Sequence, residues 1–482
     1  MKSHVDARYL LGLGALFLWG CPIDDAKFKE PAGTSSSSSS SSGSESSSSS
    51  TSSSSSSSGN GGNAGNGGAG GMGGVGGNGG AAGMGGAVTS SSSSSSSGGG
   101  MGGAAGMGGS GGGGPVCPDP GTVGSCGTPN CPPCPKLVMI GTGMIDGTAA
   151  TFESGKGWTT ATVVGMKSDY PPAFAIRTGK NDGVAVFRNT TTGFLYHLGY
   201  AAWNAGNGFG MVNDVDGGNA LVDTSPVVAA SADAVHVAFL EIGNGDKYRY
   251  AQYNNSNWTP PNEIVQNMGA SLGYCAPGLT VTGSNVVLLN PGWMNDDALY
   301  NRIRGAAPAG TWDAGYKYMS IMQVVDDVTP AIVPLGGGPT MLIVFTEKTM
   351  NKPLFSLTGS GTTWTNPVMI PASSSIEVTL LPLSAGEAIL VYRHYTTNAI
   401  FWSRFDGATW STVKEIPGGL KAKSKPTLAV GAGDAEVELL FMEETTSNAH
   451  HARLRKGAMN FDPPTSIMGT SGLVGIAAAT NL

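Results

Sequence analysis

The pattern of apolar and polar residues changes near residue 136. From there to the C-terminus, short apolar or alternating runs are separated by turn residues such as Gly, Asn and Asp. Runs of about four to eight residues bounded in this way are typical of β-strands. The apolar spacing of an amphipathic helix does not recur along this segment. We therefore expect 136–482 to be all-β.

An aromatic residue that follows a small or polar turn recurs along this segment at an almost constant interval. These residues are Trp158, Phe209, Trp258, Trp312, Trp364, Trp410 and Phe461. Successive members are separated by 51, 49, 54, 52, 46 and 51 residues. Because a fixed period of this length indicates a repeated supersecondary unit, the sequence predicts seven copies of one unit.

Each period resolves into four short strands, named A to D here in chain order. In the sixth copy the strands are 377–383, 388–392, 399–405 and a strand that begins at Trp410. Four antiparallel strands repeated radially form one blade of a β-propeller. The predicted fold is therefore a seven-bladed β-propeller.

The two ends of the segment predict how the ring closes. The first copy has strands B, C and D at 137–141, 148–153 and 158–164, but it has no strand A. The apolar stretch 473–479 lies close to the C-terminus and fits as the missing strand. The first blade would then be shared between the two ends of the segment, which removes open sheet edges.

Composition separates the residues before the propeller from the rest of the chain. Glycine accounts for 77 of 482 residues, and much of it lies with serine between Thr34 and Gly114. Such a stretch has too few apolar side chains to offset the entropy of ordering it, so we expect a disordered tether. A Gly/Ser coil of about 80 residues has a root-mean-square reach of about 50 Å.

The start of the chain has the features of an export signal. Basic residues precede the apolar run 9–19, which is too short to span a bilayer. The run ends in Leu18-Trp19-Gly20-Cys21, which resembles the lipobox of bacterial lipoproteins. The resemblance implies that Cys21 carries lipid, and the absence of a following aspartate implies the outer membrane or the cell surface. The alternative is an ordinary secretory peptide with an incidental cysteine.

Four cysteines lie close together just before the propeller. They are Cys117, Cys126, Cys131 and Cys134, in a proline-rich setting. Either a structural zinc ion or two disulfides would fit, and an exported chain favours disulfides, whose pairing stays open.

The chain thus divides into a signal peptide (1–20), a tether (21–114), a Cys/Pro-rich knot (115–135) and a propeller (136–482).

The turns between strands C and D resemble those of known propeller families. The segment Phe405-Asp406-Gly407-Ala408-Thr409-Trp410 resembles a degenerate Asp-box of sialidase-type propellers, and it is also similar to the D-G-x-x-W turns of propeller lectins that bind fucose. In those families the turn is structural and its tryptophan packs between sheets. The resemblance therefore implies core positions for Trp158, Trp258, Trp312, Trp364 and Trp410.

Ligand-binding residues are expected on the opposite face, where the B–C and D–A loops emerge together. The candidates are Arg188, Glu241, Trp293, Asn295, Asp296, Glu347, Arg393, His394 and Glu443. Trp293 is the one tryptophan in a B–C loop, and Asn295 and Asp296 stand beside it as hydrogen-bonding groups for a sugar stacked on its ring. The alternative is that Trp293 folds back and covers the top of its blade. The sequence thus predicts a binding module for glycans or another surface partner.

A carbohydrate-active hydrolase of the sialidase type is the alternative function. The resemblance would require three arginines around the substrate carboxylate, but only Arg188 and Arg393 lie in B–C loops. Carboxylate pairs could come from Glu241, Glu347 and Glu443, although spacing alone cannot bring them together. No catalytic residue, cofactor or metal site is predicted. The net charge of −7 argues against a nucleic-acid partner.

Overall fold

The computed structural model describes residues 135–481 with several gaps. The gaps are 191–195, 242–246, 255, 265–275, 292–297, 306–309, 314, 319–327, 337, 372, 374 and 384–385. The predicted signal peptide, tether and knot lie outside the described residues. Within the described ranges, no helix is long and apolar enough to cross a membrane.

Antiparallel sheets, here called blades 1 to 7, make up the described chain. Their strands, given from the innermost to the outermost, have the following bounds. Blade 1 contains β30 (Leu473–Asn481), β1 (Lys136–Gly143), β2 (Gly147–Glu153) and β3 (Gly157–Val163). Blade 2 contains β4 (Ala173–Ile176), β5 (Asp182–Asn189), β6 (His197–Asn204) and β7 (Gly208–Asp214), followed by the 3-10 turn η2 (Val215–Gly218).

Blades 3 to 5 follow in chain order. Blade 3 contains β8 (Val227–Ala230), β9 (Val235–Glu241) and β10 (Lys247–Asn254), with β11 (Asn257–Trp258) and β12 (Asn262–Glu263) on the outer edge. Blade 4 contains β13 (Gly278–Thr282), β14 (Asn285–Pro291), β15 (Leu299–Gly305) and β16 (Tyr316–Tyr318). Blade 5 contains β17 (Ala331–Pro334), β18 (Met341–Thr346) and β19 (Leu354–Ser360), with β20 (Thr363–Trp364) and β21 (Val368–Met369) outermost.

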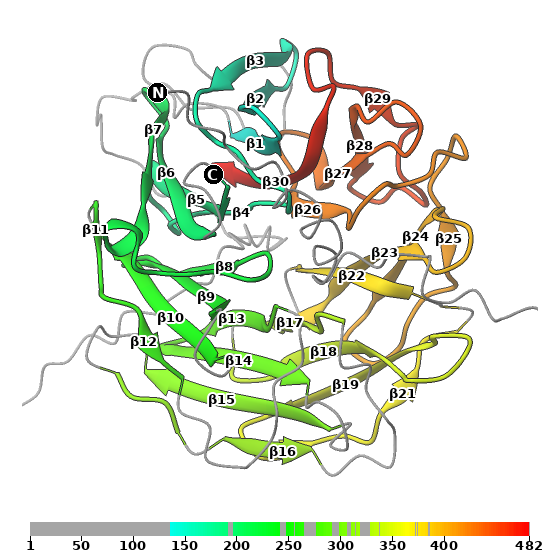
Figure 1. The fold of residues 1–482 in the computed structure, drawn as a ribbon. Coiled ribbons are helices and arrows are strands. Elements are labelled where there is room, and N and C mark those ends of the chain that lie inside the picture. Colours follow the sequence, from blue (N-terminus) through cyan, green and yellow to red (C-terminus); the bar gives the residue numbers. More distant parts are fainter. Residues whose placement is uncertain are drawn as a thin grey trace, which may run out of the picture. The chain divides into compact units, whose positions relative to one another are not determined.

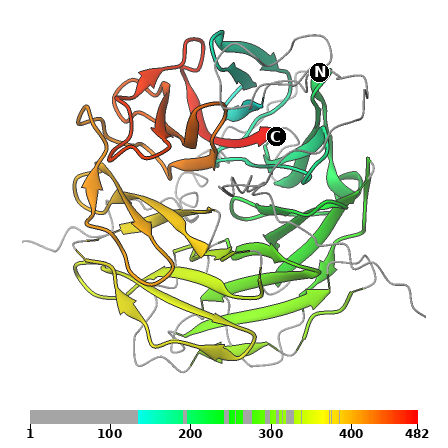
Figure 2. The same cartoon turned by 180° about the vertical axis from the view of Figure 1, so that it is seen from behind.

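Blades 6 and 7 complete the ring. Blade 6 contains β22 (Ser375–Pro382), β23 (Ala388–His394), β24 (Ile400–Phe405) and β25 (Lys414–Glu415). Blade 7 contains β26 (Thr427–Val430), β27 (Ala435–Met442), β28 (Ala449–Arg455) and β29 (Thr465–Ser466). Each innermost strand contacts those of both neighbouring blades, and β26 contacts β30 (Figures 1 and 2). The predicted seven-bladed propeller of four-stranded blades is confirmed.

Blade 1 is closed by the C-terminal strand, as the sequence predicted. β30 pairs antiparallel with β1, with Val138 opposite Ala479 (Figure 1). The close approach of β30 to β1 requires glycine at position 141, because a Cβ atom on Gly141 would lie 2.4 Å from the Leu473 Cδ1 atom. Near the same end of strand B, the other blades bury a large side chain instead: Phe187, Phe239, Leu289, Phe345, Tyr392 and Phe441. Glycine therefore makes room in blade 1 for the strand that closes the ring.

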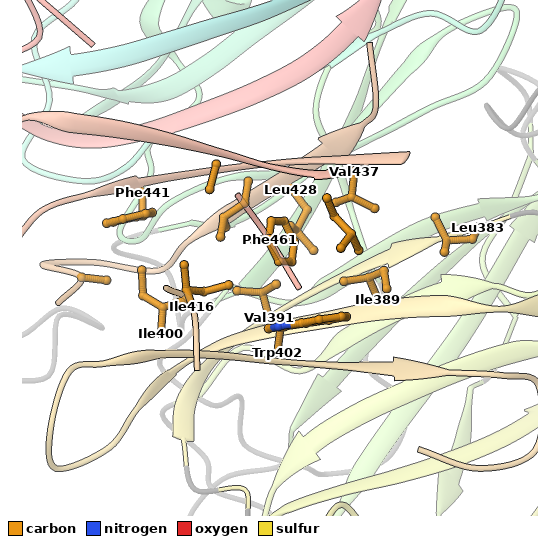
Figure 3. Close-up of a cluster of buried hydrophobic side chains, with 14 residues drawn as sticks. Leu383, Ile389, Val391, Ile400, Trp402, Ile416, Leu428, Val437, Phe441 and Phe461 are labelled. Carbon is orange, nitrogen blue, oxygen red and sulfur yellow. The ribbon is translucent and has the colours of Figure 1, made fainter. Parts of the chain in front are cut away.

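The core lies in the spaces between neighbouring blades. Between blades 6 and 7, for example, Ile389, Val391 and Trp402 pack against Val437 and Phe461 (Figure 3). Burying aliphatic and aromatic side chains in this way stabilises the fold by about 25 cal/mol per Å² of apolar surface removed from water.

The periodic aromatic residues join consecutive blades. Four of them contact the C strand of the preceding blade, in the pairs Trp158–His451, Trp258–Tyr200, Trp312–Tyr250 and Trp410–Ser356. Trp364 is partly buried against the cluster that blades 4 and 5 share. The predicted packing of the five tryptophans between sheets is therefore confirmed, and it explains the period near 50 residues.

Asp406 organises the C–D turn of blade 6. Its Oδ1 atom accepts hydrogen bonds from the amides of Ala408 (2.9 Å) and Thr409 (2.7 Å), and its Oδ2 atom accepts one from the Thr409 hydroxyl (3.1 Å). The hydrogen bonds from the Thr409 and Ala408 amides lower the pKa of Asp406. The aspartate of this turn thus has a structural role, whatever its family relationship.

Candidate functional site

The strand order gives the propeller two different faces. The B–C loops and the D–A loops emerge at one end of the blades, here called the top face, and the A–B and C–D turns emerge at the bottom face. The predicted ligand-binding residues that the structure describes belong to B–C loops or strand ends at the top face. Trp293, Asn295 and Asp296 lie outside the described residues, so their role stays a prediction.

Arg188 is buried in blade 2, where its side chain is only 6% exposed. Its guanidinium carbon lies 4.5 Å from the centre of the Tyr170 ring and 3.5 Å from that of Tyr196. Its Nε atom lies 3.4 Å from a carboxylate oxygen of Asp169, and its Nη1 atom donates to the backbone carbonyl of Asp223. Arg188 therefore holds the loops of blades 1 to 3 together and presents little of its own surface to a ligand.

Glu241 and Glu347 lie in blades 3 and 5. Glu241 forms an ion pair with Arg249 across strands β9 and β10, with an N–O distance of 2.7 Å. The half-buried Glu347 begins the B–C loop of blade 5, and its amide donates to the carbonyl of Pro353 (3.0 Å). These two carboxylates are thus separated from each other by a whole blade.

Glu443 stabilises the B–C loop of blade 7. Its carboxylate accepts hydrogen bonds from the amides of Thr445 (3.0 Å) and Thr446 (2.6 Å), and the residue is 6% exposed. Burial would raise the pKa of Glu443, but the hydrogen bonds from Thr446 and Thr445 outweigh it and lower the pKa to about 2. The carboxylate therefore stays charged at neutral pH and serves as a cap for the loop.

His394 occupies the same loop position in blade 6. Its Nδ1 atom lies 3.4 Å from the amide nitrogen and 3.3 Å from the hydroxyl of Thr396, and its ring lies 5.6 Å from that of Phe401. The amides of His394 and Glu443 each donate to a carbonyl five residues further on. The two loops thus share one geometry, with a side-chain acceptor at the first position.

A chain of hydrogen bonds links blades 6 and 7 on the top face. The Arg393 Nε atom donates to Glu377 (2.5 Å), and one of its terminal nitrogens donates to Oδ1 of Asn398 (2.8 Å). The side-chain Nδ2 atom of Asn398 in turn donates to the Glu444 carboxylate (2.8 Å). Asn398 has a φ of 57°, a left-handed conformation that asparagine tolerates better than most residues. We call Glu377, Arg393, Asn398 and Glu444 the blade 6–7 cluster.

The structure brings some of the predicted residues together and leaves others apart. Arg393 belongs to the blade 6–7 cluster, and His394 and Glu443 lie in the two loops that carry it. Arg188, Glu241 and Glu347 lie in blades 2, 3 and 5.

Sequence reasoning missed Glu377 and Asn398. The loops beginning His394-Tyr395-Thr396 and Glu443-Glu444-Thr445 share a threonine two residues after a side-chain acceptor. Comparing the two loops would have identified His394 and Glu443 as loop caps.

Three of the described carboxylates have a pKa that departs from the ordinary value. In Glu153, Asp406 and Glu443 the pKa is lowered. A general acid for glycoside hydrolysis needs a raised pKa. Among the described residues there is also no group of three or more His, Cys, Asp or Glu side chains that could hold a metal ion.

Comparisons with known proteins show propeller folds at low identity. No family model and no curated protein matches the chain. Among solved structures, AofleA from Arthrobotrys oligospora has 13% identity and a TM-score of 0.47, covering 73% of this chain and 94% of that one. The six-bladed lectin of Aleuria aurantia, described as having a fucose recognition mode, has 13% identity and a TM-score of 0.41, covering 58% and 90%.

An enzyme also appears among the similar structures. The periplasmic gluconolactonase PpgL of Pseudomonas aeruginosa has 10% identity and a TM-score of 0.48, covering 71% of this chain and 99% of that one. The similarity to all three proteins concerns the fold alone. The function of this chain has to be inferred from its own residues.

Proposed function

We propose that the protein is a glycan-binding module and that the blade 6–7 cluster is part of its binding surface. The observation that carries the proposal is the continuous chain of hydrogen bonds from Glu377 through Arg393 and Asn398 to Glu444. The Arg393 and Glu377 side chains are 14% and 21% exposed, so they are fixed and still reachable from solvent.

Such a cluster suits the chemistry of sugars. Hydroxyl groups on neighbouring carbons both donate and accept hydrogen bonds, so planar carboxylate, amide and guanidinium groups can each bind a pair of them. Because the cluster is already held by internal hydrogen bonds, little side-chain entropy is lost when a ligand binds. The half-buried ring of His394 next to Arg393 offers an apolar edge for a sugar ring.

Binding is favoured over hydrolysis by the state of the carboxylates. Glu377 and Glu241 are paired with arginines, and Glu443 is held by loop amides with a lowered pKa. A hydrolase would need one carboxyl group protonated near neutral pH and a second at about 5–10 Å from it. The blade 6–7 cluster combines acceptors with an arginine instead.

The direction of β1 bears on how the module is displayed. Strand B runs from the bottom to the top face, so Lys136 lies at the bottom face, beside Glu153 at the end of strand C. A tether that precedes Lys136 therefore joins the face opposite the blade 6–7 cluster. With a lipid on Cys21, the anchor would be attached through the face opposite the blade 6–7 cluster.

A glycan array probed with the full-length protein tests the proposal. We expect the wild-type protein to bind a defined subset of glycans and Arg393→Met to lose at least tenfold in affinity. Arg404→Met is the matched control, because Arg404 belongs to the same blade and is also paired with carboxylates, those of Glu387 and Glu436, at the bottom face. Equal losses in both variants, or no glycan binding by the wild type, would contradict the proposal.

A further inference from the structure

Three lysines follow one another at alternate positions in the D–A loop that joins blades 6 and 7. They are Lys421, Lys423 and Lys425, here called the lysine strip. The residues next to them in the chain, Ala422 and Pro426, are buried. Since successive side chains of an extended segment point to opposite sides, burial of Ala422 leaves Lys421 and Lys423 exposed on the other side.

The backbone of the strip is bonded to the loops that carry the blade 6–7 cluster. The amide of Ala422 donates to the carbonyl of Asn398 (2.8 Å), and the amide of Glu444 donates to the carbonyl of Lys421 (2.9 Å). The amide of Lys423 donates to the carbonyl of Met442 (2.8 Å). The lysine strip is therefore a fixed neighbour of Asn398 and Glu444.

The charges of Lys421 and Lys423 are not neutralised within the protein. Neither forms an ion pair with any residue that the structure describes, and the Lys423 ammonium donates to the hydroxyl of Ser447 (3.0 Å). The carboxylates of these loops have other partners: Glu443 binds the amides of its own loop, and Glu444 accepts from Asn398. The two exposed ammonium groups are thus available to an anion from solution.

Other loops of the top face have the reverse character. The loops of blades 1 and 2 carry Asp146, Asp169, Asp214, Asp216 and Asp223. A positive strip next to the binding cluster is also unexpected for a chain whose net charge is −7. The distribution of charge therefore distinguishes the blade 6–7 cluster from the rest of the top face.

We propose that the glycan bound at the blade 6–7 cluster is anionic and that the lysine strip binds its carboxylate or sulfate groups. The inference rests on the proposed glycan-binding function and names the class of ligand. Lys421 and Lys423 are both exposed and flank the buried Ala422. Their ammonium groups can therefore contact anionic groups of a linear polysaccharide, while the cluster binds its hydroxyl groups.

Three polysaccharides test the inference with the full-length protein. Polygalacturonate carries carboxylates, dextran sulfate carries sulfates, and dextran is neutral. We expect the wild-type protein to bind at least one of the two anionic polymers at least tenfold more tightly than dextran, with an affinity that falls as salt is raised. The better of the two shows which anion the strip prefers.

The variant K421A/K423A/K425A should lose at least tenfold in affinity for the anionic polymer with an unchanged melting temperature. The matched control is K156A/K180A/K456A, which removes the same charge from turns at the bottom face. The single variant Lys421→Gln should show a smaller loss of affinity for the anionic polymer. It tests the inference even if the triple variant does not fold.

The outcomes separate the two proposals. If the protein binds neutral glycans as tightly as the anionic polymers, the inference is wrong and the glycan-binding function stands. If the bottom-face variant loses as much affinity as the strip variant, the effect is one of net charge, and the strip is not a site. If no glycan of either kind binds, both proposals fail.

Discussion

Polar residues on the top face have two kinds of role, and residue type alone does not distinguish them. Glu443 and Arg188 are bound on several sides and hold loops in place, whereas Arg393 is held and still accessible. A residue that caps a loop affects mainly the stability of the fold, and a residue of the second kind affects binding. Measurements at single residues can separate the two.

Glu443→Gln tests the capping role. The carboxylate has an ordinary pKa of 4.5 and a folded-state pKa of about 2. Its stabilising effect is therefore fully present above about pH 4.5 and lost as the pH falls towards 2. We expect the variant to lower the free energy of unfolding by about 1–2 kcal/mol at neutral pH and by much less near pH 2, measured by urea denaturation. Glu415→Gln, at an exposed position, is the control.

His236 gives a pH dependence of the same direction in a higher pH range. It is buried in β9, where its Nδ1 atom lies 2.6 Å from the Tyr250 hydroxyl, and burial together with the charge of Arg304 lowers its pKa to about 4. The unfolded chain binds the proton more tightly, so stability falls as the pH drops from about 6.5 to about 4, by at most about 1.4 kcal/mol per pH unit.

The stability advantage of the wild type over His236→Gln should therefore shrink across this range. Thermal unfolding of both proteins at several pH values would measure it. An advantage that is constant with pH would show that His236 takes up its proton equally well in the folded state.

The limits of sequence reasoning are clearest at the candidate site. The position of Arg393 at the end of a B strand was sufficient to place it on the top face. Its partners could not be predicted, because Glu377 comes from another strand and Asn398 reaches the guanidinium only through a left-handed backbone conformation. Lys421 joins the site through backbone hydrogen bonds that carry no sequence signal.

At the scale of the strands, the periodic aromatic residues do most to explain why the fold was predictable. Each blade supplies one large aromatic side chain to the space between it and the preceding blade. The aromatic residues therefore recur once per blade along the sequence. Strand boundaries were less predictable. The D strand of blade 3 is split into β11 and β12, because Pro260 and Pro261 cannot donate ladder hydrogen bonds.

A double-mutant cycle measures the strength of a side-chain hydrogen bond between blades 5 and 6. The Trp410 Nε1 atom donates to the Ser356 hydroxyl (2.8 Å). We expect Trp410→Phe and Ser356→Ala to interact, with a coupling free energy of about 0.5–1.5 kcal/mol in urea denaturation. A coupling indistinguishable from zero would mean that this hydrogen bond does not hold the two blades together.

The contribution of the C-terminal strand β30 to stability can be tested without deleting the strand. Leu473 is 3% exposed and packs on β1, whereas Met468, in the loop before it, is 88% exposed. Leu473→Ala should lower the free energy of unfolding by about 2–5 kcal/mol, and Met468→Ala should change it by less than about 0.5 kcal/mol. Similar melting temperatures for the two variants would contradict a closing role for β30.

The whole molecule combines a propeller ring with a predicted lipid anchor. Lys136 starts β1 at the bottom face, and the blade 6–7 cluster and the lysine strip lie at the top face. A lipid on Cys21 and a tether of about 50 Å would keep the module near the membrane and leave its top face free to reach glycans.

Cys21→Ser tests the anchor. The variant should move from the membrane fraction to the soluble fraction, because the serine hydroxyl cannot form the thioether that carries the lipid. Cell fractionation and immunoblotting would measure the shift, with the wild-type protein as the reference. Retention of the variant in the membrane fraction at the wild-type level would show that attachment does not depend on this cysteine.

Hydrogen–deuterium exchange with and without a bound glycan locates the ligand on the full-length protein. We expect slower exchange in the top-face segments 394–399, 421–425 and 443–448, and unchanged exchange in the bottom-face turns 406–410 and 456–460. Protection of the bottom-face turns, or of the loops of blades 1 to 3 alone, would contradict a binding site at blades 6 and 7.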